Sequence, residues 1–193
     1  LDRPNVMIKV PATIEGLPAI TQLISEGVNV NVTLIFGLTR YYSVMQSYIE
    51  GLKLRAMQGK DLKGIASVAS FFLSRIDTLA DSLMKNSDLK GQTAIACARI
   101  AYQKYKRTFG SESFADLAEK GARVQRLLWA STGTKNPEES DIKYVEPLIG
   151  PGTVNTMPVA TLNAYRDMEI RRTELRIIFP MQRTYSANYM DLA

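Results

Sequence analysis

The sequence predicts an α/β fold built from parallel β/α units. Short apolar, β-branched stretches alternate along the 193 residues with longer stretches whose apolar residues recur at helical spacing. Strands that alternate with helices are typical of parallel sheets, and not of sandwiches or helical bundles. With 46% hydrophobic and 22% charged residues, the composition is that of a globular domain with ample material for a core. We therefore expect one α/β domain, or a piece of a larger one.

Five strands are expected. The clearest is 28–36, where valines alternate with polar residues, so that the two classes face opposite sides of the strand. The other four are short apolar runs, and the first of them contains one lysine, Lys9. The expected strands cover residues 6–10, 28–36, 65–72, 127–130 and 154–157.

Helices are expected between and after these strands. The first has an apolar stripe, a proline in its first turn and a glycine at its end, Gly27. Thr39 is expected to cap the second helix, and the acidic stretch after Pro137 to form a short one. The expected helices cover residues 15–27, 39–59, the segment from the third strand to 84, 93–109, 113–121, a short stretch after 137, and the chain from 158 onward.

The absence of histidine excludes several classes of enzyme. The chain has no histidine, so Ser-His-Asp and Cys-His hydrolases, His-ligated zinc sites and imidazole acid–base chemistry are all ruled out for its own residues. The single cysteine, Cys97, excludes an internal disulfide and a multi-cysteine metal cluster, and suits a reducing, cytoplasmic setting. Catalysis would have to use lysine, carboxylates, hydroxyls or an external cofactor.

The net charge and the hydropathy of the chain indicate which kinds of partner it could bind. The 24 Lys+Arg against 19 Asp+Glu give a net charge of +5, which favours anionic partners without choosing between phosphate esters and nucleic acid. The longest uncharged stretch, 147–165, contains prolines and glycines, so no membrane span and no membrane partner are expected. The N-terminus has no signal-peptide pattern and no initiator Met, and a strand begins within its first residues, so we expect a fragment.

Lys9 is the first residue that could carry chemistry. An unpaired ammonium inside a buried strand is costly, and burial tends to favour its neutral form. A neutral amine on a rigid strand is what Schiff-base catalysis requires, since only the free base attacks a carbonyl. The alternative is an edge-strand lysine whose amine extends to solvent, and from spacing alone this is the commoner case.

Asn31 and Thr33 form the second candidate group. They are two residues apart in a strand, so their side chains share one face. Polar groups that point inward from a parallel strand need partners, and a substrate with several hydroxyls could supply them. Partners from the backbone remain an equal alternative.

Four residues after strands form a weak anion-binding pattern. Ser70 and Arg75 are expected to lie just beyond the end of one strand, and Ser131 and Lys135 beyond the end of another. Sites in parallel β/α folds form beyond the carboxyl ends of strands, so these residues could bind a phosphate. Singly, each is more often a helix cap or a surface residue.

Two clusters of charged residues, one basic and one acidic, are better explained by structural roles than by binding sites. A basic stretch with interleaved tyrosines could bind nucleic acid, but a solvated helix face is the better interpretation, and no nucleic-acid partner is expected. An acidic cluster could suggest a metal, but without histidine an acidic first turn of a helix explains it better, and no metal site is expected. The two clusters are Arg99, Tyr102, Lys104, Tyr105, Lys106 and Arg107, and Glu138, Glu139 and Asp141.

Several of these residues stand in strings that closely resemble the transaldolase family. The strings are NVMIKVPAT (5–13), EGL (15–17), GVNVNVTLIF (27–36), ASFFLSRI (69–76), WASTGTKNP (129–137) and TVNTMP (153–158). They occur in the family's order and cover roughly 4–167. The segment between 87 and 121 resembles the longer bacterial subfamily, which is sometimes fused to a sugar-phosphate isomerase.

The resemblance implies a role for each candidate residue. Lys9 matches the family's Schiff-base lysine, Asn31 a substrate-binding asparagine and Thr33 a water-positioning threonine. Ser70 matches a hydroxyl-binding serine and Arg75 a phosphate-binding arginine. Ser131 and Lys135 fall in the family's next phosphate loop, where Lys135 stands in for an arginine.

The resemblance also implies a fold and an activity. The family folds as an eight-stranded β/α barrel of the TIM-barrel type, with about 250 residues or more. It transfers a dihydroxyacetone unit between sugar phosphates in the pentose phosphate pathway, without metal or cofactor. Expected partners are fructose 6-phosphate, sedoheptulose 7-phosphate, erythrose 4-phosphate and glyceraldehyde 3-phosphate.

Two departures from the family pattern matter. The chain matches from the family's fourth strand onward, so residues 1–167 are expected to form about five units of an incomplete barrel. The family's catalytic Asp and Glu and another substrate Asn lie in the strands before it, so no acid/base carboxylate can be assigned here. Residues 168–193 do not resemble the family's C-terminus, and we expect them to be a helix extension followed by an atypical tail.

Two alternatives to transaldolase activity stay open. A related Schiff-base aldolase would release dihydroxyacetone to water, and a product assay without acceptor would distinguish it. A non-catalytic β/α remnant could instead bind an anionic polymer through residues 99–107.

Overall fold

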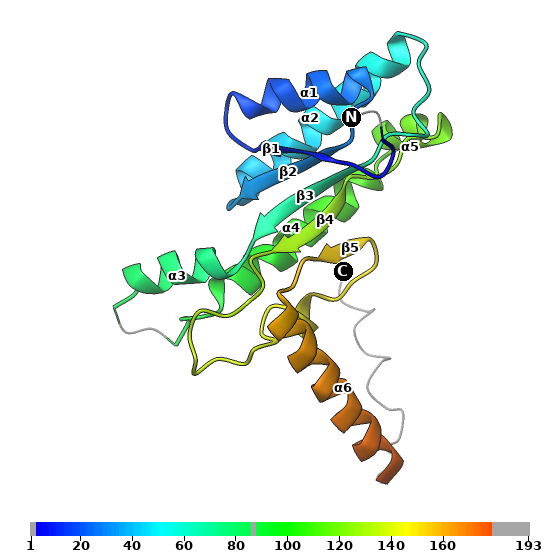
Figure 1. Ribbon diagram of the computed structural model, residues 1–193. Coiled ribbons are helices and arrows are strands. Elements are labelled where there is room, and N and C mark those ends of the chain that lie inside the picture. Colours follow the sequence, from blue (N-terminus) through cyan, green and yellow to red (C-terminus); the bar gives the residue numbers. More distant parts are fainter. Residues whose placement is uncertain (1–2, 86–87, 179–193) are drawn as a thin grey trace.

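The computed structural model describes residues 3–85 and 88–178, and side chains as far as 168. Five strands form one sheet in the order β1-β2-β3-β4-β5, and every neighbouring pair is parallel. Figure 1 shows them side by side. The strands are β1 (Ile8–Pro11), β2 (Val30–Ile35), β3 (Ser67–Phe72), β4 (Arg126–Ala130) and β5 (Thr153–Asn155).

The helices connect successive strands, as the sequence predicts for β/α units. A parallel pair needs such a crossover, because its second strand must start at the end where the first one started. The helices are α1 (Gly16–Glu26), α2 (Leu38–Met57), α3 (Ser74–Leu83), α4 (Thr93–Phe109), α5 (Glu112–Glu119) and α6 (Val159–Ile178), with the short 3-10 helix η1 (Glu146–Leu148).

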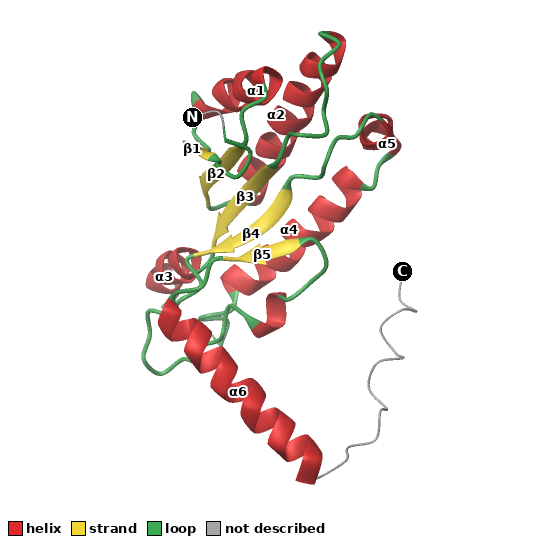
Figure 2. Cartoon of the chain, turned by 45° about the vertical axis from the view of Figure 1, so that its right-hand side comes forward, coloured by secondary structure: helices red, strands yellow, loops and turns green. Residues whose placement is uncertain are grey.

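The two faces of the sheet are covered differently. One face packs against α1, α2 and α4, which lie along the same side of the sheet in Figure 2. Val32, Phe71 and Trp129 lie on this face and are buried in the main core. The opposite face carries a small apolar cluster of Val68, Leu128 and Ala130, with Met7, Phe72 and Val154 partly buried beside it.

The sheet is open at both edges. Within the described residues, β1 pairs only with β2 and β5 only with β4. The arrangement is therefore a five-strand arc of the β/α barrel type, in which the face that carries the small cluster corresponds to the interior of a barrel.

Two local predictions were wrong. No helix forms in residues 137–145, where the backbone makes separate turns: the Glu139 N–H donates to the Asn136 carbonyl at 3.1 Å, and the Lys143 N–H to the Ser140 carbonyl at 3.0 Å. Thr39 is not a cap either. The helix has already begun at Leu38, and the Gly37 carbonyl accepts the Tyr41 N–H.

Helix α6 runs through the expected boundary at residue 168. It continues without interruption to Ile178, and Figure 1 shows it projecting away from the sheet. The extension of the helix was expected, whereas the tail beyond 178 lies outside the described residues. The division at 168 stays a prediction.

Tyr41 offers a test of how the core is packed. Its side chain is fully buried on α2, and its hydroxyl has no hydrogen-bond partner in the described part of the chain, so burial raises the pKa of the phenol. An unpaired buried hydroxyl costs stability. We therefore expect Tyr41→Phe to raise the free energy of unfolding by about 1 kcal/mol, measured by urea denaturation.

Tyr48 is the matched control for this substitution. It is equally buried on the same helix, but its hydroxyl donates to the Arg123 carbonyl at 2.7 Å. Tyr48→Phe should lower the free energy of unfolding by about 1–2 kcal/mol, because the carbonyl is left unpaired. Equal destabilisation by both substitutions would contradict the interpretation of Tyr41.

Candidate functional site

Lys9, Asn31 and Ser70 lie on adjacent strands and on the same face of the sheet. Lys9 is in register with Asn31, and Asn31 with Val68, whose side chain belongs to the small cluster. Ser70 follows Val68 by two residues, so it shares that face. All three side chains therefore point away from α1 and α2. The Lys9 side chain is exposed on this open sheet.

A hydrogen bond joins two of these residues. The Ser70 hydroxyl donates to Asn31 Oδ1 at 2.8 Å, which fixes the amide so that its NH₂ group remains a donor. Asn31 lies one strand away from Lys9, and Ser70 lies two strands away. The arrangement places an amine beside an amide and a hydroxyl, which are groups that bind the carbonyl and hydroxyls of a sugar.

Thr33 lies on the same face, closer to the end of β2. It is in register with Pro11, two residues after Lys9 in β1. Its side chain is only 4% exposed, and its Oγ1 has no hydrogen-bond partner within the described residues. This hydroxyl is therefore free to bind another group.

Ser131 directly follows β4 and is held in an unusual backbone conformation. Its φ is 54°, in the left-handed region that non-glycine residues seldom adopt. Its Oγ lies 2.8 Å from the Oγ of Ser74, the first residue of α3. The structure thus brings Ser131 to the start of the helix that also carries Arg75.

Arg75 lies on an aromatic platform. Its guanidinium stands 5.5 Å from the ring centroid of Phe72, and this ring packs against Phe36 at 5.4 Å. An arginine stacked on an aromatic ring is oriented while its donors stay available. The exposed side chain also lines a cavity of about 480 Å3 with Phe36 and the apolar face of α3.

Lys135 lies in a different environment from Arg75. It lines a polar cavity of about 210 Å3 whose other charged members are the carboxylates of Asp77, Asp81 and Glu139. Ser74 lines the same cavity. The two cations thus line separate cavities on the two sides of the start of α3, which Figure 1 shows beyond the arrowheads of β3 and β4.

The two alternative clusters have structural partners. Glu139 Oε1 accepts from the Lys143 ammonium at 2.6 Å. In the basic stretch, Tyr105 is buried, and the Tyr102 hydroxyl donates to the Pro151 carbonyl at 3.1 Å. The ammonium of Lys106 lies 5.2 Å from the Tyr102 ring centroid. These tyrosines pack against the protein itself, which disfavours a platform for stacking bases.

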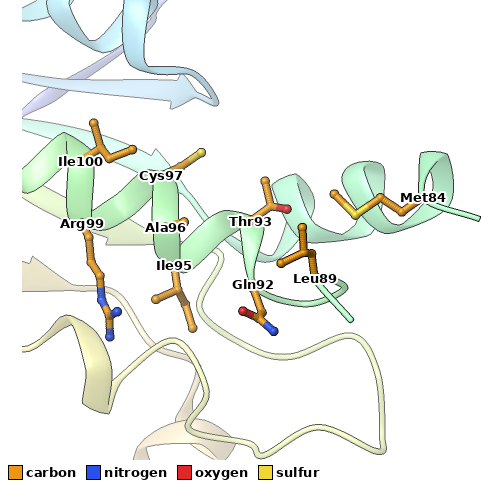
Figure 3. Close-up of a pocket in the computed structure, with 9 residues that line it drawn as sticks. All are labelled: Met84, Leu89, Gln92, Thr93, Ile95, Ala96, Cys97, Arg99 and Ile100. Atoms are coloured by element: carbon orange, nitrogen blue, oxygen red, sulfur yellow. The ribbon is translucent and has the colours of Figure 1, made fainter. Parts of the chain in front are cut away.

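A separate groove of about 510 Å3 lies along the start of α4 (Figure 3). It contains none of the predicted site residues. Its lining is mostly apolar, with Arg99 as its one charged residue and Cys97 on the side of the helix that Ile100 also faces. Burial, followed by the nearby Asp77, raises the pKa of the Cys97 thiol, which keeps it protonated and a poor nucleophile.

Ser74 and Asp77 were not among the residues predicted from the sequence. Both are buried polar residues on the first turn of α3, with exposures of 2% and 3%. The string Ser-Arg-Ile-Asp has the spacing of a capping box, which could have drawn attention to them. Their contacts to residues far along the chain could not have been found from that spacing.

Among the helices of the described part, none is long and apolar enough to cross a membrane.

Comparisons with known proteins identify the family. The family described as "Transaldolase/Fructose-6-phosphate aldolase" matches residues 1–190. A transaldolase of Saccharopolyspora erythraea is 54% identical over 171 residues, covering 86% of this chain and 47% of that protein. One from Trichodesmium erythraeum is 52% identical over 181 residues, covering 86% and 48%. One from Thermobifida fusca is 54% identical over 173 residues, covering 86% and 47%.

The chain spans about half the length of the curated relatives that it matches. Its five parallel strands, the string around Lys9 and a match over nearly the whole sequence agree with one another. The chain belongs to the transaldolase/fructose-6-phosphate aldolase family.

Proposed function

We propose that this chain carries the Schiff-base half of a transaldolase site, which transfers a dihydroxyacetone unit between sugar phosphates. The observation that carries the proposal is the placement of Lys9 in register with Asn31, whose amide is held by Ser70, on the sheet face opposite the helices. The donors would be fructose 6-phosphate or sedoheptulose 7-phosphate. The acceptors would be erythrose 4-phosphate or glyceraldehyde 3-phosphate, as in the pentose phosphate pathway of the cytoplasm.

The proposed reaction begins with the Lys9 amine. It attacks the ketone carbon of the donor, and loss of water gives an iminium. The C4 hydroxyl then gives its proton to water, the C3–C4 bond breaks, its electron pair moves toward the iminium nitrogen to give an enamine, and an aldose phosphate leaves. The enamine carbon adds to the acceptor aldehyde, whose oxygen takes up a proton. Addition of water to the new iminium releases the product and regenerates the amine.

The other residues would hold the substrate and water. Asn31 and Ser70 would bind the hydroxyls of the three-carbon unit, since the Asn31 NH₂ group remains a donor and the Ser70 oxygen can still accept. Thr33, whose hydroxyl has no partner among the described residues, would hold the water that enters and leaves the iminium. Ser131 and Arg75 would bind the phosphate, and Lys135, which lines the other cavity, would act on it at longer range. This chemistry needs neither a metal nor a diffusible cofactor.

A product assay tests this function against the aldolase alternative. The chain is incubated with fructose 6-phosphate, with and without erythrose 4-phosphate, and the products are separated. A transaldolase forms sedoheptulose 7-phosphate when the acceptor is present. Free dihydroxyacetone in the absence of acceptor would instead identify an aldolase, and the absence of both products would leave the chain without turnover of its own.

The two cations should contribute unequally to phosphate binding. Arg75 is stacked and free of carboxylate neighbours in its cavity, whereas Lys135 shares its cavity with three. We expect Arg75→Ala to weaken binding of fructose 6-phosphate roughly ten- to hundredfold, through loss of a charge-assisted hydrogen bond. Lys135→Ala should have a smaller effect in the same titration.

Fructose provides the control ligand for these variants. Neither substitution should change its affinity, because it has no phosphate. If the unmodified chain binds fructose and fructose 6-phosphate equally well, the assignment of Arg75 and Lys135 to a phosphate site is wrong.

A further inference from the structure

Ser74 and Ser131 are joined by more than one contact. Besides the 2.8 Å between their hydroxyl oxygens, the Ser74 N–H donates to the Ser131 carbonyl at 3.0 Å. One residue earlier, the Leu73 N–H donates to the Ala130 carbonyl at 3.0 Å. The start of α3 is thus bonded to the end of β4 through backbone and side chain together.

These contacts hold a conformation that Ser131 would not adopt alone. A left-handed φ is unfavourable for a residue with a side chain, so the surroundings must stabilise it. Ser74 is 2% exposed and cannot exchange this partner for bulk water. The direction of the Ser131 hydroxyl is therefore set by Ser74.

Asp77 fixes the helix turn on which Ser74 lies. Its Oδ1 accepts from the Ala94 N–H at the start of α4, at 2.7 Å. Its Oδ2 accepts from the Tyr144 hydroxyl at 2.7 Å, and the Lys143 ammonium lies 3.4 Å away. A carboxylate with three donors resists displacement, so it anchors α3 to two distant segments.

The residue after Ser131, Thr132, is connected to Tyr144 through Asn155. Thr132 donates to Asn155 Oδ1 at 2.9 Å, and the Asn155 amide donates to the Tyr144 carbonyl at 3.4 Å. The loop after β4 is therefore bound to α3 at Ser131 and to β5 at Thr132.

We propose that Ser74 is a positioning residue of the phosphate site, which orients the Ser131 hydroxyl, and that Asp77 anchors the helix turn that carries it. The inference rests on the proposed function of Ser131. An ionised phosphate oxygen only accepts hydrogen bonds, so Ser131 must donate to it. The Ser131 oxygen then accepts from Ser74, and this bond both aims and polarises the donor.

Inorganic phosphate is the probe that tests this proposal. Its affinity for the 193-residue chain is measured by calorimetry for the unmodified protein, Ser74→Ala, Asp77→Asn and Ser82→Ala. Ser82 is the matched control, because it is an exposed serine on the same helix whose hydroxyl donates to the Leu79 carbonyl within that helix. We expect roughly tenfold weaker binding for Ser74→Ala, weaker binding also for Asp77→Asn, and no change for Ser82→Ala.

A second measurement separates positioning from general damage. Borohydride trapping of the lysine adduct is followed with fructose 6-phosphate and with unphosphorylated dihydroxyacetone. Ser74→Ala should lower the ratio of the two trapping rates, whereas a purely structural role would lower both by the same factor and leave the ratio unchanged.

The outcomes distinguish this inference from the proposed function. Unchanged phosphate affinity in Ser74→Ala, an unchanged trapping ratio, or no phosphate binding by the unmodified chain would each overturn the inference. Phosphate binding that depends on Ser74, without any borohydride-trapped lysine, would support the positioning role and overturn the Schiff-base proposal.

Discussion

Replacing Lys9 with alanine should abolish covalent trapping of the donor sugar. When borohydride is added to the unmodified chain with fructose 6-phosphate, reduction of the iminium leaves the three-carbon unit attached through a stable amine. Without the Lys9 amine no iminium forms, so mass spectrometry should show no adduct. The effect is expected to be complete, since no other group on this part of the sheet can replace a primary amine.

The control for this experiment is Lys53→Ala. Lys53 is an exposed lysine on α2, on the helical side of the molecule, and its removal should leave trapping unchanged. Because the Lys9 side chain is also exposed, Lys9→Ala should unfold at nearly the same temperature as the unmodified chain. Trapping that persists in Lys9→Ala, or an adduct that peptide mapping places on another lysine, would contradict the assignment of Lys9.

The sequence predicts the strands and the shared face of the site because both follow from short-range periodicity. Valines alternate with polar residues around Asn31 and Thr33, so one side of the strand must be apolar and the other polar. Lys9 precedes a helix and a parallel strand, and the register that aligns it with Asn31 is the one that buries Val30 and Val32 against the helices. A shift of one residue would expose those valines.

The contacts of Ser74 and Asp77 could not be predicted in the same way. Ser74 meets Ser131 57 residues later in the chain, and Asp77 meets Tyr144 67 residues later. Which polar groups pair across such distances depends on where whole helices pack. The helix expected after Pro137 is a separate case: the acidic charges favour a first helical turn, but the backbone makes only separate turns there, one from Asn136 to Glu139 and one from Ser140 to Lys143.

The open sheet should make the chain associate. The unpaired edges of β1 and β5 present free backbone donors and acceptors, and the face with Leu128 and Val154 is not covered by any helix in the described part of the molecule. Both features favour pairing with another chain. We expect size-exclusion chromatography to show oligomers or aggregates that grow with protein concentration.

A lysine placed on this face should oppose association. Val154→Lys puts a charge on the partly buried rim of the apolar cluster, so the equilibrium should shift toward monomer. Met57→Lys is the matched control, because Met57 is 83% exposed at the end of α2 and does not belong to the apolar cluster on the open face. Equal effects of the two substitutions would mean that general charge, and not the open face, governs association.

Turnover should be low for a separate reason. The family's acid/base carboxylates have no counterpart among the residues matched here, and a general acid/base contributes roughly 10²–10⁴-fold to a rate. The chain should therefore form the Lys9 adduct, which needs only the amine and the local pocket, while a coupled transaldolase assay shows a rate lower by about that factor. Trapping and turnover thus report on different parts of the site. A stable monomer with full transaldolase activity would show that five strands suffice, and that the open edges and the uncovered face are closed by the chain itself.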